Sequence, residues 1–162
     1  MVRISPSLVL ASLGAGLIAC SVSVGPGSEA WAPDSSSILV ESSYTGITDA
    51  RLSVISDSAA WQAAWSEMFG TLAPQPPAPV VDFAAQSVLL VALGSRPTGG
   101  YSIRIDSVAH SATQNVVFVT DTSPGSGCLV TQAITTPVEA VVTPWPVDAA
   151  QWYTSRVTHD CT

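Results

Sequence analysis

Gln86-Ser-Val-Leu-Leu-Val-Ala-Leu-Gly-Ser-Arg-Pro-Thr-Gly-Gly-Tyr-Ser-Ile-Arg-Ile-Asp-Ser-Val108 is the stretch that decides the fold of this chain. Residues 88–93 form an unbroken apolar run, which is typical of a strand buried on both faces. Residues 101–108 alternate between apolar and polar side chains, the period that points one row inward and the other toward solvent. We therefore expect two β-strands, joined by a glycine-rich hairpin over residues 94–100.

The rest of the chain continues this β pattern. Turn residues interrupt short apolar or alternating runs, which predicts strands at residues 38–44, 50–56, 115–120, 131–136, 137–143 and 151–157. Residues 45–49 have the composition of a hairpin, and the proline-rich residues 71–79 indicate an extended connector. We expect one mainly β domain over residues 38–162, close to the α+β class. Its predicted form is an antiparallel sandwich or partly open barrel.

One short amphipathic helix interrupts the strands. Apolar side chains recur at helical spacing after the serines at 56 and 58, and Gly70 is placed to end the helix. The stripe consists of Trp61, Ala64, Trp65, Met68 and Phe69. Two tryptophans one turn apart could stack on a ligand, but they more often form the face by which a single helix packs on a sheet. We expect the packing face.

The first residues resemble a bacterial lipoprotein leader. Residues 1–19 carry Arg3 and then an apolar run too short for a comfortable membrane span, as in a signal peptide. The run ends in Leu17-Ile-Ala-Cys20, which resembles a lipobox. This implies acylation of Cys20 with a lipid such as palmitate and anchorage in the cell envelope, on the outer membrane or periplasmic face where the host has an outer membrane. The alternative is an ordinary secretory signal. Residues 20–37 are rich in Gly, Pro and Ser, which predicts a flexible tether.

Two cysteines remain, Cys128 and Cys161, in a chain sent to an oxidising compartment. An even pair there favours a disulfide. Closing a loop of about 34 residues would contribute roughly 3–4 kcal/mol in the chain-entropy model. The competing interpretation, a nucleophilic Cys128, has no histidine near it in sequence.

The charge and the rarity of catalytic residue types exclude several functions. Without its leader the chain has four arginines against twelve acidic residues, a formal net charge of −8, and no lysine. Nucleic-acid binding needs clustered cations. Walker-type nucleotide binding, Schiff-base chemistry and Ser-Lys hydrolysis need lysine. The two histidines, His110 and His159, lie in no metal-binding motif, and no Gly-x-Ser-x-Gly elbow is present. We therefore expect no catalysis, no cofactor and no metal.

The loop Arg96-Pro-Thr-Gly-Gly-Tyr101 carries more chemistry than a turn requires. Pro97 fixes one backbone dihedral, and Gly99 and Gly100 permit positive φ. The simplest interpretation is a turn selected for its shape. A tight turn, however, does not need an exposed Arg96 and Thr98 together. We therefore predict that residues 96–101 contact a protein partner.

The run from residues 91 to 103, centred on Pro-Thr-Gly-Gly-Tyr101, resembles the PrcB-type C-terminal domain. The strand at 116–119, the proline-glycine loop after it and Thr136-Pro-Val also fit this pattern, as do the Trp61–Trp65 helix and Val81-Asp-Phe83. The resemblance spans roughly residues 46–145. It implies a noncatalytic envelope domain that binds or stabilises another protein, since the family takes its name from a lipoprotein subunit of an envelope protease complex.

A second resemblance gives an alternative function. Pro97-Thr98-x-Gly100 is similar to the Asn-Pro-Thr-Thr-Gly loop of chagasin-type inhibitors, which plug papain-like proteases with loops of a β-sandwich. Arg96 stands where those proteins have asparagine, and Gly99 where they have threonine. Residues 125–127 resemble one further inhibitor loop, and residues 144–145 faintly resemble another. This resemblance implies a protease inhibitor that uses residues 96–101.

Overall fold

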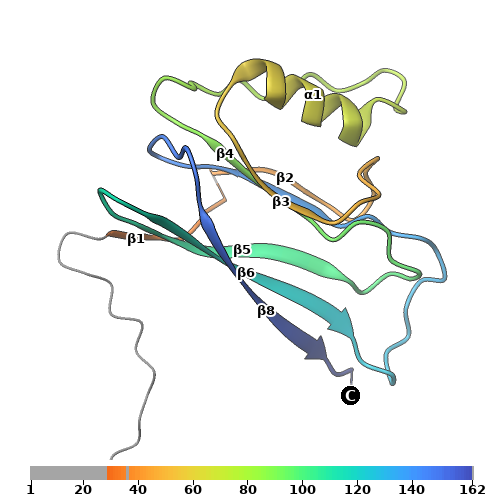
Figure 1. Ribbon diagram of the computed structural model, residues 1–162. Coiled ribbons are helices and arrows are strands. Elements are labelled where there is room, and N and C mark those ends of the chain that lie inside the picture. The colour runs from red at the N-terminus through yellow and green to blue at the C-terminus, as the bar shows by residue number, and fades with distance from the viewer. Residues whose placement is uncertain (1–28, 36, 162) are drawn as a thin grey trace, which may run out of the picture.

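The computed structural model describes residues 29–35 and 37–161, which form two packed β-sheets with one helix on the outer face of one sheet (Figure 1). In chain order the elements are β1 (Glu29–Trp31), β2 (Ile38–Ser42), β3 (Arg51–Ile55), α1 (Ser58–Phe69), β4 (Val88–Ala92), β5 (Ser102–His110), β6 (Asn115–Pro124), β7 (Val138–Val142) and β8 (Gln151–His159). The predicted mainly β sandwich with one short helix is therefore confirmed.

Each sheet has four strands. Sheet A has the order β1-β5-β6-β8, and sheet B has the order β2-β7-β4-β3. All neighbours are antiparallel except β6 and β8, which run parallel. A parallel pair needs a long crossover, and here the chain passes through β7 of sheet B between β6 and β8. The predicted C-terminal edge strand is present, with this parallel pairing.

β4 is the centre of the fold because both of its faces are buried. Leu90 and its same-face neighbours pack under α1, while Leu89 and Val91 pack against sheet A. All three side chains are fully buried. This short strand therefore joins two separate hydrophobic cores. Burying each such side chain contributes about 1.5–3 kcal/mol to folding. The prediction of a strand buried on both faces is confirmed.

The two predicted hairpins are wrong. β4 and β5 lie in different sheets, so residues 94–100 cross from sheet B to sheet A instead of turning back within one sheet. The physical reason is that β3 and β7 occupy both edges of β4, which leaves β5 no edge to pair with. Residues 45–49 likewise connect β2 and β3, which form opposite edges of sheet B.

The helix follows its prediction closely. The Asp57 side chain caps α1 by accepting the Ala60 N–H at 2.8 Å, and Gly70 follows its last turn. The buried side chains of α1 are Trp61, Ala64, Trp65 and Met68, as the stripe predicts. The indole N–H groups of the two tryptophans donate to carbonyls of the proline-rich connector, those of Pro79 and Pro76. This connector therefore satisfies the polar atoms of the packing face. Within the described chain, no helix is long and apolar enough to cross a membrane.

The ordered domain starts earlier than residue 38. Residues 29–31, predicted as part of the tether, form β1, and Ala30 pairs with Ala109 of β5. The Trp31 ring packs 6.0 Å from that of Trp145. The high content of Gly, Pro and Ser around residues 29–31 predicted a tether instead of a strand.

The predicted signal peptide, Cys20 and the tether before residue 29 lie outside the described residues. Residues 131–136, predicted as a strand, make a single bridge, between Thr135 and Arg96.

Candidate functional site

Three connecting segments meet at one end of the sandwich, residues 43–50, 94–101 and 125–137 (Figure 1). The Ser95 N–H donates to the Thr48 carbonyl at 2.9 Å, which joins the first two. Arg96 and Thr135 exchange two backbone hydrogen bonds of 2.8 and 3.0 Å, which join the second and third. We call this end of the molecule the loop end.

The loop of residues 94–101 is fixed at both of its ends by glycines with positive φ. Gly94 has φ 71°, and a Cβ there would lie 2.7 Å from the Thr48 carbonyl oxygen. Gly100 has φ 85°, and a Cβ there would lie 3.0 Å from side-chain carbons of Pro124 and Val130. Both positions require glycine, for conformation and for space. In between, the Thr135 hydroxyl donates to the Thr98 carbonyl at 2.8 Å. The backbone of the loop is therefore held from several sides.

The loop's side chains are only partly free. The Arg96 guanidinium lies 5.8 Å from the centre of the Tyr101 ring, within the range of a cation–π contact. The Thr98 hydroxyl donates to the Gly99 carbonyl at 3.1 Å. Pro97 and Gly100 are exposed, while Arg96 and Thr98 are partly exposed. The structure thus brings all six predicted contact residues, 96–101, together on the surface of the loop end.

Exposed apolar side chains border the loop, and the sequence analysis did not find them. Leu129 is fully exposed, and Ile134 is 71 % exposed next to the Arg96–Thr135 bridge. Tyr44 is 62 % exposed, and the adjacent Thr45 bonds Thr136 through its amide and its hydroxyl. The residue-131 segment was predicted as a strand, in which an isoleucine is expected to point inward. No pattern in the sequence marks it as exposed.

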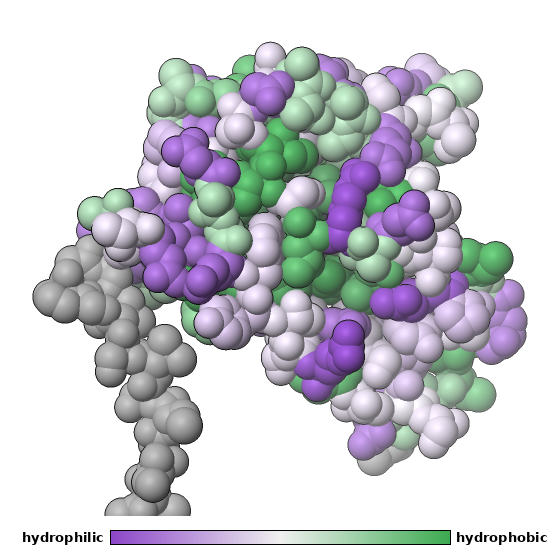
Figure 2. Space-filling model, viewed as in Figure 1, coloured by the Kyte–Doolittle hydropathy of each residue, from purple (hydrophilic) through white to green (hydrophobic). Residues whose placement is uncertain are grey.

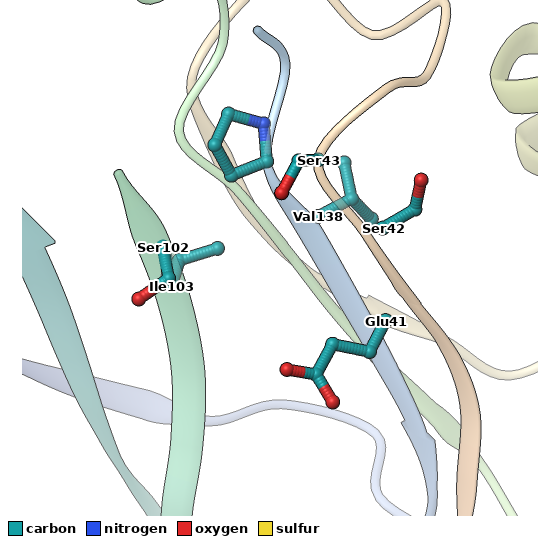
Figure 3. Close-up of a pocket in the computed structure, with 7 residues that line it drawn as sticks. Glu41, Ser42, Ser43, Ser102, Ile103 and Val138 are labelled. Carbon is teal, nitrogen blue, oxygen red and sulfur yellow. The ribbon is translucent and has the colours of Figure 1, made fainter. Parts of the chain in front are cut away.

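A pocket of about 220 Å³ opens beside the loop, between β5 and the edge of sheet B formed by β2 and β7 (Figure 3). Its lining is mostly polar and consists of Glu41, Ser42, Ser43, Ser102, Ile103, Pro137 and Val138. Small-molecule sites are usually larger, about 300–1,000 Å³, and mostly apolar. The pocket is therefore smaller and more polar than a typical small-molecule site.

A buried carboxylate lies next to this pocket. Glu139 is 1 % exposed, and its side chain accepts the backbone N–H of Ile105. Burial raises the pKa of Glu139, while the hydrogen bond from Ile105 and the positive charge of Arg104 lower it in part. The open edge of β5 explains this contact, since the three-residue β1 pairs only with residues 108–110.

Of the two histidines, His110 lies away from the loop end, and His159 contacts it through its backbone. His110 stacks on Trp145 at 4.6 Å, and its Nδ1 lies 2.7 Å from Asn115 Oδ1, at the far end of β5. The backbone of His159 accepts the Gly125 N–H. Within residues 29–35 and 37–161, no three His, Cys, Asp or Glu side chains gather as metal ligands would.

The disulfide is formed as predicted. Cys128 and Cys161 are joined, with their Cα atoms 4.9 Å apart. The bond ties the end of β8 to the loop after β6, so the C-terminus contributes to the loop end. The prediction from the cysteine count is confirmed.

The structure separates the three segments that resemble chagasin-type loops. Pro124, which precedes the second segment, lies beside the first, since a Cβ on Gly100 would lie 3.0 Å from Pro124 Cβ. Trp145 instead packs on Trp31 and His110, at the opposite end of the sandwich. The first two segments therefore lie at the loop end, and the third lies at the opposite end of the sandwich.

Comparison with known proteins identifies one family. Residues 87–144 match the family model described as PrcB C-terminal. Neither the curated proteins nor the solved structures contain a match to this chain. The matched segment runs from the start of β4 to the end of β7, so it includes the loop end and leaves out α1, which the sequence resemblance had included. Residues 87–144 are therefore similar to the PrcB C-terminal family, the family that the Pro-Thr-Gly-Gly-Tyr101 loop indicated.

Proposed function

We propose that this protein is a noncatalytic, lipid-anchored domain of the bacterial cell envelope that binds or stabilises another protein. An envelope protease complex is the first candidate partner. The family match supports the link to a protease complex, because the family is named for a subunit of one. The lipobox-like Leu17-Ile-Ala-Cys20 supports the anchor.

One structural observation carries the proposal of a binding surface. The loop end combines a backbone held in place by Thr48, Thr131 and Thr135 with exposed apolar side chains, Ile134 and Leu129. A rigid surface loses little conformational entropy on binding. Exposed apolar side chains gain free energy when a partner covers them. Figure 2 shows hydrophobic and hydrophilic side chains mixed across one face of the molecule, so polar contacts are available beside the apolar ones.

Within the loop, the backbone and the side chains would make different contacts with the partner. Pro97 and Gly100 are exposed and let a partner approach the backbone closely. The Arg96 guanidinium, held over Tyr101, offers a positioned cation in a chain with few cations. An acidic or hydrogen-bond-accepting group on the partner fits this side chain best.

The test is co-purification of the full chain from its native envelope. Ile134→Asp and the double variant Arg96→Ala, Thr98→Ala should each reduce recovery of the partner. Val80→Asp is the matched control, because Val80 is fully exposed and lies next to Pro79, whose carbonyl accepts the indole N–H of Trp61 in α1. Equal recovery with all variants, each still folded, would remove the loop end as the binding surface.

The chagasin-like alternative keeps support from one observation, the position of Pro124, which precedes residues 125–127, beside Gly100 of the loop. It predicts that the protein inhibits papain-like cysteine proteases when titrated against them. Inhibition that survives Arg96→Ala together with Thr98→Ala would contradict the use of this loop.

A further inference from the structure

β8 is a long edge strand without the usual protection. It is the outermost strand of sheet A and has nine residues, paired with β6 over its whole length without a register shift (Figure 1). The other edge strands in the described chain are shorter, three residues in β1 and five in β2 and β3. Natural edges are blunted by short length, bulges, proline or lysine. β8 contains no proline and no lysine, and its one permanently charged residue, Arg156, lies 3.7 Å from the carboxylate of Asp121 in β6.

The open edge of β8 presents a regular row of backbone groups. The His159 carbonyl accepts the Gly125 N–H at 2.8 Å, so residue 159 points its backbone toward the β6 side. Backbone direction alternates along a strand. The N–H and C=O groups of Trp152, Thr154, Arg156 and Thr158 therefore point to the open side, where they can pair with another strand.

We propose that β8 pairs with β8 of a second copy of this chain, antiparallel, with Ser155 on the two-fold axis. This register overlaps all nine residues of both strands. It places Thr154 opposite Arg156 and Trp152 opposite Thr158, so each outward N–H meets an outward C=O. The two sheets A then form one continuous sheet, and the same surface serves both subunits, as a two-fold interface requires.

The side chains on the outer face fit the same register. Tyr153 is 57 % exposed and Val157 is 46 % exposed, and Tyr153 stacks on Phe118 at 5.7 Å. With Ser155 on the axis, each Tyr153 lies opposite Val157 of the second copy. An aromatic side chain opposite a β-branched one is a favourable cross-strand pair. The dimer therefore covers apolar area that the monomer leaves in water.

Charge disfavours the register that is shifted by one residue toward Arg156. A shift that centres the axis on Arg156 would place two arginines directly opposite, which is destabilising. With Ser155 on the axis, Arg156 faces Thr154 instead. β8 contains no Asp or Glu, although the mature chain is strongly acidic, so two copies can meet along this edge without opposing carboxylates in the strand.

The first test is disulfide trapping of the full chain in membranes of cells that express it. Ser155→Cys places a thiol on the axis in a non-hydrogen-bonded pair, where Cα atoms lie about 4.5 Å apart, within the range for a disulfide. Thr154→Cys is the matched control, because its two thiols would be offset along the strands. We expect a disulfide-linked dimer with Ser155→Cys that is several-fold stronger than with Thr154→Cys. Equal yields, or a stronger dimer with Thr154→Cys, would overturn the proposal.

The second test introduces a charge opposite Arg156 of the second copy, in the Ser155→Cys background. Thr154→Arg faces Arg156 of the second copy at two symmetric positions, while Thr154→Glu can pair with it. Each substitution should change the dimer dissociation constant by about 2- to 30-fold, Arg weakening and Glu strengthening the dimer. Resistance to trypsin checks that each variant is folded. Folded variants with unchanged trapping would overturn the proposal, and a strand from another protein on this edge would give no Ser155→Cys dimer.

Discussion

Gly100→Ala should destabilise the domain, because this position combines positive φ with close packing. An L-residue in the left-handed region costs about 1–2 kcal/mol. A Cβ at Gly100 would also lie 3.0 Å from Pro124 Cβ and Val130 Cγ1, which forces a small shift of the loop. Alanine also lowers the conformational entropy of the unfolded chain, which offsets about 0.4–1 kcal/mol of this cost. Because the close contact of the new Cβ adds to the cost of the positive φ, we expect the free energy of unfolding to fall by about 1–2 kcal/mol.

The neighbouring Gly99 is the matched control. It has no positive φ, and a Cβ there would meet Thr131 at 3.4–3.5 Å, close to an ordinary van der Waals distance. Gly99→Ala should therefore be neutral or slightly stabilising. Urea unfolding of the oxidised protein measures both. With an m-value of about 2 kcal/mol/M, Gly100→Ala should lower the midpoint by roughly 0.5–1 M. Equal midpoints for the two variants would refute the claim that the backbone at residue 100 is constrained.

Three further predictions concern the disulfide, the buried Glu139 and the cap of α1. Cys128→Ser with Cys161→Ser should lower the free energy of unfolding by about 3–4 kcal/mol, since it opens a loop with a sequence separation of 33, and urea midpoints compare it with the oxidised parent. Because burial raises the pKa of Glu139, the folded parent should lose stability as pH rises above the ordinary carboxyl range. Glu139→Gln can still accept the Ile105 N–H and should lack this loss when midpoints at about pH 4 and pH 7 are compared. Asp57→Ala should cost about 1 kcal/mol through loss of the α1 cap, and Asp57→Asn much less, as measured by thermal unfolding.

The sequence predicted those features that depend on local pattern. The stripe from Trp61 to Met68 predicted the buried face of α1, since helical spacing alone determines which side chains share a face. The apolar run 88–93 predicted a strand buried on both faces, and cysteine parity predicted the disulfide. Strand pairing was not accessible in this way. A glycine-rich connector has the same composition whether it closes a hairpin or crosses between sheets, so both predicted hairpins were wrong.

The candidate site was also predicted only in part. Residues 96–101 were singled out because glycine and proline mark an unusual backbone, and the structure shows positive φ at Gly100. Their contact with a partner stays a prediction. The exposed Ile134 and Leu129 were missed, since an apolar residue in a short polar stretch gives no sign of its exposure. β8 was predicted as an edge strand, but which of its backbone groups point to the open side depends on its register with β6. That pairing is a property of the whole topology.

The crossing between sheets changes what the loop can do. In a hairpin, two paired strands would hold residues 94–100, and the rest of the domain would not affect them. Here the support comes from the residues that lead into β7, through the Arg96–Thr135 bridge and the hydrogen bond from Thr135 to the Thr98 carbonyl. A partner that contacts residues 96–101 therefore also meets the adjacent exposed Ile134. Because the two segments hold each other, binding energy at one is coupled to the conformation of the other. Substitution of Thr135 should then weaken partner binding as a change in the loop itself would, although its own side chain is buried.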